Sequence, residues 1–345
     1  MENIIQLLKN IRKQSMLRRS YTRSFAFVGI GNHSLNNLYP VLHYLDVPLK
    51  YIVVKSQRTA KLINQNRTGI EGTTDYERAL DDPDIQGILI CASPDSHYEL
   101  VKKALQYKKN VFVEKPPCCK ESELRDLIEI ERLSTKSCVV GLQKRYSTCT
   151  GILKKEIAGS EVISYNYRFV TGNYPEGDPY WDLFIHPVDL ATFIFGEMQV
   201  VSVVQTGRAG AISAFIQARQ GQTIASIELS TQYSWNNPCE SLIVNTSKGV
   251  YTLSNHRLLD FQPAPGVLFS IPKEKIFPSA SQTKHLFNGN SFLPVVENNE
   301  LMAQGFYREL KCFVDICENK RTTNHSTLAS LIPVFDLLTT LKTQC

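Results

Sequence analysis

A short apolar run that leads directly into a glycine turn is the feature that most restricts how this chain can fold. Phe25-Ala26-Phe27-Val28 is long enough for a buried strand and too short for a helix. It continues into Gly29-Ile30-Gly31-Asn32-His33-Ser34, and apolar residues then recur at helical spacing at Leu35, Leu38, Val41, Leu42 and Leu45. A strand, a glycine turn and a helix in succession are the context that a dinucleotide-binding fingerprint requires. The alternative is a chance glycine turn without a ligand.

The next hundred residues continue the same alternation. Short apolar runs at 51–54, 85–91 and 111–113 predict strands, and the segments 59–66, 76–80 and 97–107 predict the helices between them. Strands and helices that alternate at this spacing form right-handed units on a parallel sheet. Both faces of such a sheet are covered, which explains why its strands are continuously apolar. We therefore expect a Rossmann-type dinucleotide-binding domain at 24–120.

A different pattern follows residue 120. A charged amphipathic helix at 121–134 and a strand at 137–142 precede long β-rich runs at 162–170, 200–206, 211–218, 223–233, 242–244 and 250–253. With a helix at 186–195, these runs predict a second, α+β domain at 121–325 built on a large, mostly antiparallel sheet. We expect a long surface loop at 261–294, helices at 301–319 and 328–342, and a C-terminal segment, 326–345, that packs back on the body.

The charge of the chain is concentrated at its beginning. The formal net charge is +5, and residues 1–24 account for all of it with six basic residues and one acidic residue, Glu2. The remainder is neutral, which argues against a nucleic-acid-binding surface. No apolar run is long enough to span a bilayer. The nine cysteines have no metal-ligand spacing and are odd in number, so we expect no metal site and a reducing, cytoplasmic environment.

The basic segment at 1–23 lies outside the expected domains. Ile4, Ile5, Leu7, Leu8 and Ile11 form an apolar stripe beside basic residues, which predicts an amphipathic helix. It could be a transit peptide, a membrane-surface helix or an arm that packs on its own or a neighbouring subunit. We favour the packing arm.

The glycine turn and the end of the second strand suggest the cofactor. Gly29 and Gly31 let the backbone turn and approach a pyrophosphate, and Ser34 is small enough to replace the third glycine of the fingerprint. Where an acidic residue would bind the ribose hydroxyls of NAD, the chain has Lys55-Ser56-Gln57-Arg58. Ser56 and Arg58 suit a 2′-phosphate and favour NADP(H) over NAD(H). The alternative is a solvated surface turn.

Two later stretches carry a resemblance to a known family. They are Ser93-Pro94-Asp95-Ser96-His97 after one strand and Glu114-Lys115-Pro116 after the next, preceded by Asp81-Asp82-Pro83-Asp84-Ile85. From Ser24 onward the chain resembles the glucose–fructose oxidoreductase/inositol dehydrogenase (Gfo/Idh/MocA) family. The resemblance implies an NAD(P)-dependent oxidoreductase acting on a sugar, cyclitol or related polyol. It also implies that the cofactor contacts come from Asn32, His33, Ser93, Pro94, His97, Glu114, Lys115 and Gln143.

Lys115 is the first catalytic candidate. A lysine at the carboxyl end of a parallel strand lies where ligands bind in open α/β sheets, so its ammonium could hold a substrate oxygen. The alternative is a surface ion pair with Glu114, although adjacent residues on a strand point to opposite sides.

Asp182 and His186 are the second candidates. Four residues apart in a helix or tight turn, they would share a face, and histidine has a pKa suited to proton transfer. They match the family's Asp-x-Gly-x-His-x-x-Asp pattern, with Asp189 as the last position in a packing or capping role. The glycine is replaced by Phe184, which would place a bulky ring near the substrate. A structural histidine with a capping aspartate is the alternative.

Weaker expectations complete the hypothesis. Gln143-Lys144-Arg145-Tyr146 resembles the family's Asn/Gln-x-Arg-Phe segment, so Arg145 and Tyr146 are candidate substrate-binding residues together with Arg168. The open face of the C-terminal sheet predicts a homodimer or homotetramer, since an apolar sheet face must be covered. Two alternative functions stay open: a dinucleotide-binding regulatory protein without turnover, and an NAD-dependent glycosidase on the same scaffold.

Overall fold

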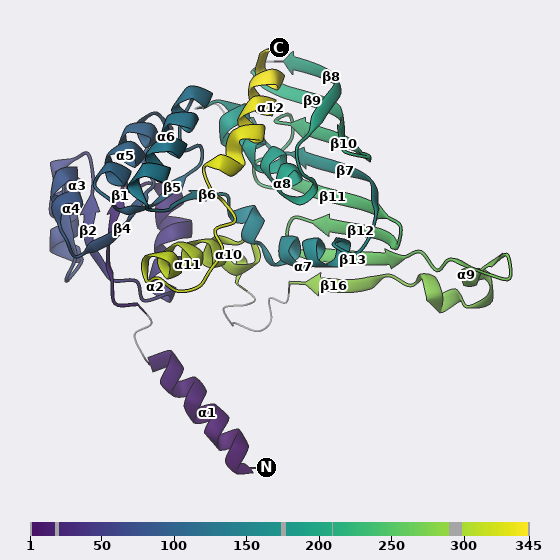
Figure 1. The fold of residues 1–345 in the computed structure, drawn as a ribbon, viewed down its shortest axis with the longest axis horizontal. Coiled ribbons are helices and arrows are strands. Elements are labelled where there is room, and N and C mark those ends of the chain that lie inside the picture. Colours follow the sequence, from purple (N-terminus) through teal and green to yellow (C-terminus); the bar gives the residue numbers. More distant parts are fainter. Residues whose placement is uncertain (1, 18–20, 174–176, 209, 290–298, 344–345) are drawn as a thin grey trace.

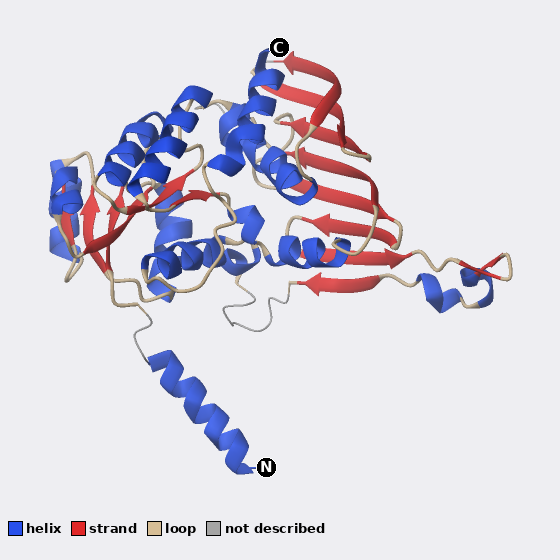
Figure 2. Ribbon diagram, viewed as in Figure 1, coloured by secondary structure: helices blue, strands red, loops and turns tan. Residues whose placement is uncertain are grey.

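Two β-sheets with helices packed against them make up the body of the protein in the computed structural model (Figures 1 and 2). The structure describes residues 2–17, 21–173, 177–208, 210–289 and 299–343. One sheet has six strands and the other has eight, and the helices of the body lie beside and between them. The predicted fold class is confirmed: a Rossmann sheet precedes a large, mostly antiparallel sheet.

The first sheet is entirely parallel, with the order β3-β2-β1-β4-β5-β6 of dinucleotide-binding folds. Its strands are β1 (Ser24–Val28), β2 (Leu49–Val53), β3 (Glu71–Thr73), β4 (Ile85–Ile90), β5 (Asn110–Glu114) and β6 (Cys138–Gly141). The strand order reverses between β1 and β4, and this is the point at which ligands bind such sheets.

Helices connect these strands where the sequence indicates them. They are α2 (Tyr39–Tyr44), α3 (Gln57–Asn66), α4 (Tyr76–Asp81), α5 (Pro94–Gln106) and α6 (Glu121–Ser134). Polar side chains start two of them, since Ser56 Oγ accepts from Thr59 N–H before α3 and Asp75 accepts from Arg78 N–H before α4. The helix expected after the glycine turn opens as a π-helical segment, η1 (Ser34–Leu38), and continues as α2.

The parallel sheet extends beyond the boundary that the sequence suggests at residue 120. Strand β6 hydrogen-bonds beside β5, so the segment through Gly141 belongs to this sheet. Helix α11 (Phe306–Cys317), far along the chain, also packs on it: the Phe313 ring centroid lies 6.0 Å from the ring centroids of both Phe25 and Phe112. The two domains therefore interleave in sequence, because the cofactor sheet takes its cover from the C-terminal part.

The second sheet has the order β16-β13-β12-β11-β7-β10-β9-β8. Its strands are β7 (Val162–Val170), β8 (Gln199–Arg208), β9 (Ala211–Gln220), β10 (Thr223–Ser230), β11 (Cys239–Thr246), β12 (Gly249–Ser254), β13 (Leu258–Pro263) and β16 (Lys284–Asn288). Only the β7–β10 pair is parallel among the described strand pairs of this sheet. Helices α7 (Thr148–Ile157), which the sequence analysis did not predict, and α8 (Ile185–Phe195) pack against the sheet. Side chains such as Val204 and Phe215 remain exposed.

Two C-terminal expectations need correction. The region expected as a loop at 261–294 contains the hairpin β14 (Val267–Leu268) and β15 (Ile271–Pro272), helix α9 (Lys273–Ile276), turn η4 (Pro278–Ser281) and β16; residues 290–294 lie outside the described part. The expected helix at 301–319 is divided into α10 (Glu300–Ala303) and α11. The break is at Gly305, which has φ +103° and approaches Gln143 so closely that a Cβ would lie 1.9 Å from its carbonyl oxygen.

The two ends of the chain differ in their packing. After the short turn η6 (Ala329–Leu331), helix α12 (Ile332–Thr343) packs on the body, with the Phe335 ring 4.6 Å from Trp181. The N-terminal segment forms helix α1 (Glu2–Leu17), as the amphipathic pattern predicts, and extends away from the body (Figure 1). Its apolar residues Ile4, Leu7, Leu8 and Ile11 are exposed rather than packed on this subunit. Within the described residues, no helix is both long and apolar enough to cross a bilayer.

Candidate active site

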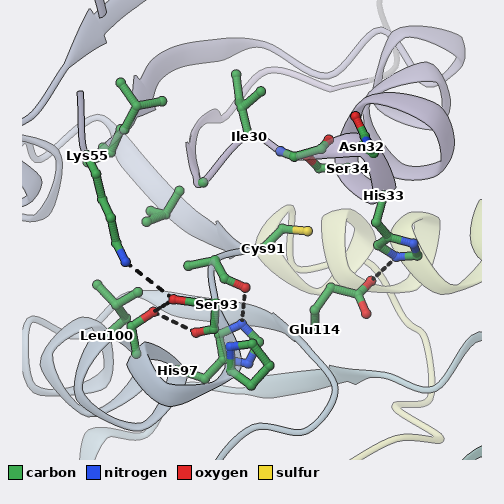
Figure 3. A pocket seen from close by; sticks show the side chains of 18 of the residues that line it. Ile30, Asn32, His33, Ser34, Lys55, Cys91, Ser93, His97, Leu100 and Glu114 are labelled. Atoms are coloured by element: carbon green, nitrogen blue, oxygen red, sulfur yellow. Dashed lines mark hydrogen bonds and ion pairs between the residues drawn. The ribbon is translucent and has the colours of Figure 1, made fainter. Parts of the chain in front are cut away.

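A cavity of about 950 Å³ lies along the carboxyl ends of β1, β2, β4 and β5. Residues from the glycine turn, from the ends of β2 and β4 and from the start of α5 line its cofactor side (Figure 3). Asp182, Leu183, His186 and Trp235, all from the second half of the chain, line it as well. The cavity therefore joins the Rossmann sheet to the segments that carry the predicted catalytic residues.

The glycine turn has the geometry that a dinucleotide requires. Gly29 has φ +90°, and a Cβ there would lie 2.4 Å from the Cys91 carbonyl oxygen, so only glycine fits between β1 and β4. At Gly31 no atom lies within 4 Å of a built Cβ, which leaves open space where a pyrophosphate approaches. Ser34 is buried, and its Oγ accepts a 2.9 Å hydrogen bond from Gly31 N–H. Serine thus serves the packing role of the third glycine.

Lys55, rather than Arg58, is the cation at the ribose end of the cavity. Its Nζ donates to Ser93 Oγ at 3.3 Å, so this hydrogen bond joins the segment after β2 to the start of α5 (Figure 3). Ser56 also lines the cavity, where it caps α3, whereas Arg58 is on the exposed surface of α3 and is not among the lining residues. The candidate contact for a 2′-phosphate is therefore Lys55, three residues before Arg58 in the chain.

His97 hydrogen-bonds to the loop after β4 and to the loop after β5. Its ring is buried, with Nδ1 2.7 Å from the Pro116 carbonyl oxygen and Nε2 3.0 Å from the Ala92 carbonyl oxygen. Burial lowers the pKa of His97, so the ring is neutral near pH 7. Ser93 and Pro94 start α5 beside it and line the cavity. His97 holds the turn after Lys115 in place while one side of its ring faces the cavity.

At the other end, His33 and Glu114 are in direct contact and both line the cavity, with His33 Nε2 3.2 Å from Glu114 Oε1 (Figure 3). The His33 ring also lies 5.8 Å from the Phe306 ring at the start of α11. Cys91 lines the cavity nearby, and burial raises the pKa of its thiol to about 12. It is therefore a neutral thiol at physiological pH rather than a nucleophile.

Lys115, Asp182 and His186 line the same part of the cavity. Lys115 follows β5, and its Nζ donates a 2.6 Å hydrogen bond to the Asp182 carbonyl oxygen. Asp182 lies in the π-helical turn η3 (Tyr180–Phe184), and His186 lies in the first turn of α8. The Asp182 carboxylate accepts from Asp178 N–H at 2.9 Å. The π-helical turn brings together two residues that the sequence placed on one helical face.

The electrostatics of this group lower the pKa values of both Lys115 and His186. Burial lowers the pKa of Lys115, although Glu114 and Asp182 oppose that shift. Burial lowers the pKa of His186 well below its usual value, and the positive charges of Lys115 and Lys144 lower it further. Burial raises the pKa of Asp182, while Lys115 opposes that shift. A neutral imidazole beside a cation can accept a proton from a hydroxyl that the cation holds.

A buried ion pair lies behind His186. Lys144 Nζ is 2.5 Å from Glu240 Oε2 and 4.7 Å from the centroid of the Phe169 ring. Glu240 also accepts from the Tyr167 hydroxyl at 2.5 Å. Because Glu240 partly compensates the charge of Lys144, the pair adds only a moderate positive field at the imidazole.

Phe184 does not lie where the sequence suggested. Its side chain is fully buried, and its ring packs edge-on against Tyr180 at 5.7 Å. The residue that replaces the family's glycine points into the core because the turn from η3 into α8 directs it away from the cavity. The expected bulky ring beside the substrate is therefore absent from the described lining residues.

The three weaker substrate candidates do not line the cavity. Arg145 is buried and donates from Nε to Asp189 at 2.9 Å and 3.1 Å, so the pair joins η2 (Gln143–Tyr146) to α8. Tyr146 is buried beside it, with its hydroxyl 3.1 Å from Ser326 Oγ. Arg168 lies on the open face of the second sheet, paired with Glu228 at 2.8 Å. Of that segment only Gln143 reaches the cavity.

Sequence reasoning missed several lining residues. Thr74 and Tyr76, which begin the segment of α4, line the adenosine side, and Trp235 lines the cavity from the turn between β10 and β11. The pattern around Trp235 resembles that of any surface turn, so no local signal marks it. Within the described ranges, no group of three or more His, Cys, Asp and Glu side chains is arranged to hold a metal ion.

The comparisons with known proteins agree with this geometry. Residues 23–142 match the model of the Gfo/Idh/MocA oxidoreductase family, described as an NAD-binding Rossmann fold. Residues 23–142, the Rossmann part of the chain, belong to the Gfo/Idh/MocA family. An inositol 2-dehydrogenase of Rhizobium meliloti is 25% identical to it over 64% of this chain and 73% of the relative. The matches to this and other curated relatives span 37% to 73% of the lengths of those relatives.

Solved structures extend the likeness in fold to both domains. A dehydrogenase from Chromobacterium violaceum superimposes with a TM-score of 0.78 at 19% identity, covering 94% of this chain and 95% of that one. A levoglucosan dehydrogenase, solved with NADH and levoglucosan, has a TM-score of 0.73 at 15% identity and covers 92% and 95%. At these identities the likeness establishes the fold and leaves the substrate open.

Proposed function

We propose that this protein is an NAD(P)-dependent oxidoreductase that interconverts a hydroxyl and a carbonyl group of a sugar, cyclitol or sugar derivative. The observation that carries the proposal is the shared cavity, in which Lys115 and His186 lie beside a glycine turn shaped for a dinucleotide. The names of the relatives, an inositol dehydrogenase and a levoglucosan dehydrogenase, support a polyol or sugar as the substrate.

The residues have complementary tasks in this mechanism. A bound nicotinamide dinucleotide supplies the hydride acceptor or donor. The turn at Gly29 and Gly31 would hold its pyrophosphate, and Glu114 and Gln143 line the cavity towards the nicotinamide end. In the oxidation direction, the neutral imidazole of His186 takes the hydroxyl proton, while the ammonium of Lys115 holds the oxygen and stabilises its growing negative charge. Asp182 orients Lys115 through its backbone carbonyl and faces the substrate with its carboxyl group.

NADP(H) is the proposed cofactor. Lys55 and Ser56 line the cavity at the end of β2, and a lysine with a hydroxyl suits a 2′-phosphate. The first eight residues after β2 contain no acidic side chain that could bind the ribose diol of NAD. Arg58 can contribute only long-range attraction from the outer surface of α3.

The open face of the second sheet is the proposed dimer surface. Val204 and Phe215 are paired across β8 and β9, are 70% and 51% exposed, and share this face with Arg168 and Glu228. Burying such a face against a second copy removes apolar area from water. Replacing Phe215 with glutamate should convert the assembly to monomers in analytical ultracentrifugation. We further propose that α1 packs on a neighbouring subunit. We also propose that the enzyme is cytoplasmic.

A substrate screen tests the function. Purified protein is incubated with NADP⁺ or NAD⁺ and a panel of hexoses, inositols and sugar nucleotides, and reduced cofactor is followed by its absorbance. Turnover of one of these compounds supports the proposal. Tight cofactor binding without turnover of the panel in either direction would instead favour the regulatory alternative. Hydrolysis of a glycoside with no net change in cofactor would favour the glycosidase.

A further inference from the structure

Asp178 lies just before the π-helical turn η3 and has no part in the mechanism above. It is four residues before Asp182, to which it is bonded through the main chain and the side chain. Its N–H donates to Asp182 Oδ2 at 2.9 Å, and its carbonyl oxygen accepts from Asp182 N–H at 2.8 Å. Its own Oδ1 accepts from Tyr180 N–H at 3.0 Å, at the first residue of the turn. Asp178 therefore holds both the backbone of η3 and the Asp182 carboxylate.

The other carboxylate oxygen of Asp178 is paired with a lysine of the C-terminal helix. Lys342 Nζ contacts Asp178 Oδ2, close to the end of α12. Seven residues earlier in α12, the Phe335 ring lies 4.6 Å from the ring of Trp181, which belongs to η3. Residues seven apart lie on one face of a helix. One face of α12 therefore contacts η3 through an apolar pair and contacts the residue before the turn through a charged pair.

Opposite charges surround the Asp182 carboxyl group. Burial raises its pKa, and Lys115 and the Asp178 N–H oppose that rise. The carboxylates of Asp178 and Asp95 add to the rise because they repel a negative charge at Asp182. Pairing with Lys342 offsets the charge of Asp178. Lys342 therefore supports an arrangement in which two carboxylates lie near each other.

We propose that Asp178 is a positioning residue for the turn that carries Asp182, and that Lys342 of α12 anchors it. Two groups depend on this placement: the Asp182 carboxylate, which faces the substrate, and the Asp182 carbonyl oxygen, which accepts from Lys115 Nζ at 2.6 Å. Asp178 itself is not among the described lining residues, so it acts through Asp182. Displacing reacting groups by about 1 Å can cost about 100-fold in rate. The inference rests on the proposed function, because it names what holds the same proposed catalytic groups in place.

Steady-state kinetics with a substrate from the screen test the positioning. Asp178→Ala should lower kcat about 10- to 100-fold and leave KM and NADPH affinity close to wild type, because the reacting groups shift while the binding contacts remain. Asp178→Asn keeps an oxygen acceptor for Tyr180 N–H and should retain most of kcat. The matched control is Asn299→Ala before α10, which removes the same kind of bond, to Leu301 N–H at 2.9 Å, outside the cavity lining. Its kcat should equal that of wild type.

The anchoring role of Lys342 is tested with and without Asp178. The two side chains are 52% and 30% exposed, and such ion pairs contribute little, so Lys342→Met should lower kcat only about 2- to 5-fold. Lys342→Arg should retain the wild-type kcat. In the Asp178→Ala background, Lys342→Met should have no further effect, because Lys342 acts through Asp178. An equal loss in both backgrounds overturns the anchoring. An unchanged kcat in Asp178→Ala, or a loss that appears only in KM, overturns the positioning role.

A measurement without substrate separates this inference from the redox proposal. Hydrogen–deuterium exchange of the holoprotein with NADPH reports on the amides of Tyr180 and Asp182, which both donate to Asp178. Peptides that cover η3 should exchange faster in Asp178→Ala than in wild type, and peptides from α6 should not change. Faster exchange confined to η3 supports the placement of the turn by Asp178 even if the screen finds no turnover. Unchanged exchange in η3, or faster exchange throughout the chain, overturns it.

Discussion

Lys115 Nζ donates a 2.6 Å hydrogen bond to the backbone carbonyl oxygen of Asp182. This bond crosses from the end of a Rossmann strand to the π-helical turn of the second domain, 67 residues later in the chain. It holds the ammonium in the cavity that His186 also lines, and it joins the two domains at the proposed catalytic site. The predictions below begin from this pair.

Removing either catalytic group should abolish most turnover without loss of the cofactor. Lys115→Met and His186→Gln should each lower kcat about 10²- to 10⁴-fold, the usual contribution of a positioned acid or base. NADPH affinity, measured by fluorescence titration, should stay close to that of wild type. Lys102→Met, which removes a lysine paired with Asp126 on the surface of α5, is the control. Normal turnover in both catalytic variants would disprove the assignment.

The pH dependence of kcat/KM for oxidation should show a broad plateau. The pKa of His186 is lowered below 6.5, so the base stays deprotonated and active down to mildly acidic pH. The pKa of Lys115 is lowered below 10.5, so the ammonium is lost, and activity falls, on the alkaline side before a free lysine would titrate. Lys115→Arg should shift the alkaline limb upward, because arginine stays charged. An acid limb above pH 6.5 would contradict the assignment of His186.

The same shift makes a prediction about stability. The unfolded chain binds a proton at His186 below pH 6.5, whereas the folded state keeps the imidazole neutral to lower pH. The unfolded state therefore binds more protons in this window, and stability must decrease as pH falls through it. His186→Gln should reduce this dependence, as measured by denaturant unfolding at several pH values. An unaltered slope would show that the imidazole is not buried as a neutral group.

Cofactor preference should depend on Lys55 more than on Arg58. Lys55→Ala should weaken NADPH binding about 10- to 100-fold, as loss of a charge-assisted hydrogen bond implies, and should change NADH binding little. Arg58→Ala should have a smaller effect, since Arg58 lies outside the cavity lining. Isothermal titration of both cofactors with both variants measures this. If Arg58→Ala loses more NADPH affinity than Lys55→Ala, then Arg58 on α3, and not Lys55, contacts the 2′-phosphate.

Two arginines that the sequence suggested for substrate binding should differ in their effect on stability. Arg145→Met leaves the buried Asp189 without its partner and should lower the free energy of unfolding by about 3–5 kcal/mol. Arg168→Met removes a surface pair with Glu228 and should cost less than about 1 kcal/mol. Chemical denaturation gives both values. If the double variant Arg145→Met/Asp189→Leu regains the free energy of unfolding that Arg145→Met loses, the unpaired carboxylate is the cause of the loss.

Deleting residues 1–20 tests the role of α1. The exposed apolar residues of this helix predict that truncation weakens subunit assembly while the thermal stability of the isolated body is unchanged. Sedimentation velocity over a range of concentrations measures the assembly. Unchanged assembly would contradict the packing arm, and binding of the full chain to anionic vesicles would then favour the membrane-surface alternative.

Much of this protein could be predicted from local patterns. The strand–glycine–helix sequence at Gly29, the alternation that follows it and the placement of Lys115 at a strand end all depend on neighbours in the chain. Hydrophobic periodicity and glycine positions reflect backbone requirements that act over a few residues, which is why they can be interpreted without a fold. Asp182 and His186 were also found this way, since their four-residue spacing places them on the same face of a turn.

Only the tertiary structure decided where side chains of the second domain point. Arg145 and Phe184 lie next to cavity residues in sequence but turn into the core, where Asp189 and Tyr180 receive them. Lys55 lines the cavity whereas Arg58 lies on the exposed surface of α3, and Trp235 reaches the cavity from a turn 49 residues beyond His186. The sequence by itself determined the cofactor fold and placed Lys115, Asp182 and His186 among the candidates that line the cavity. The rest of the site depended on packing between distant segments, which no local pattern encodes.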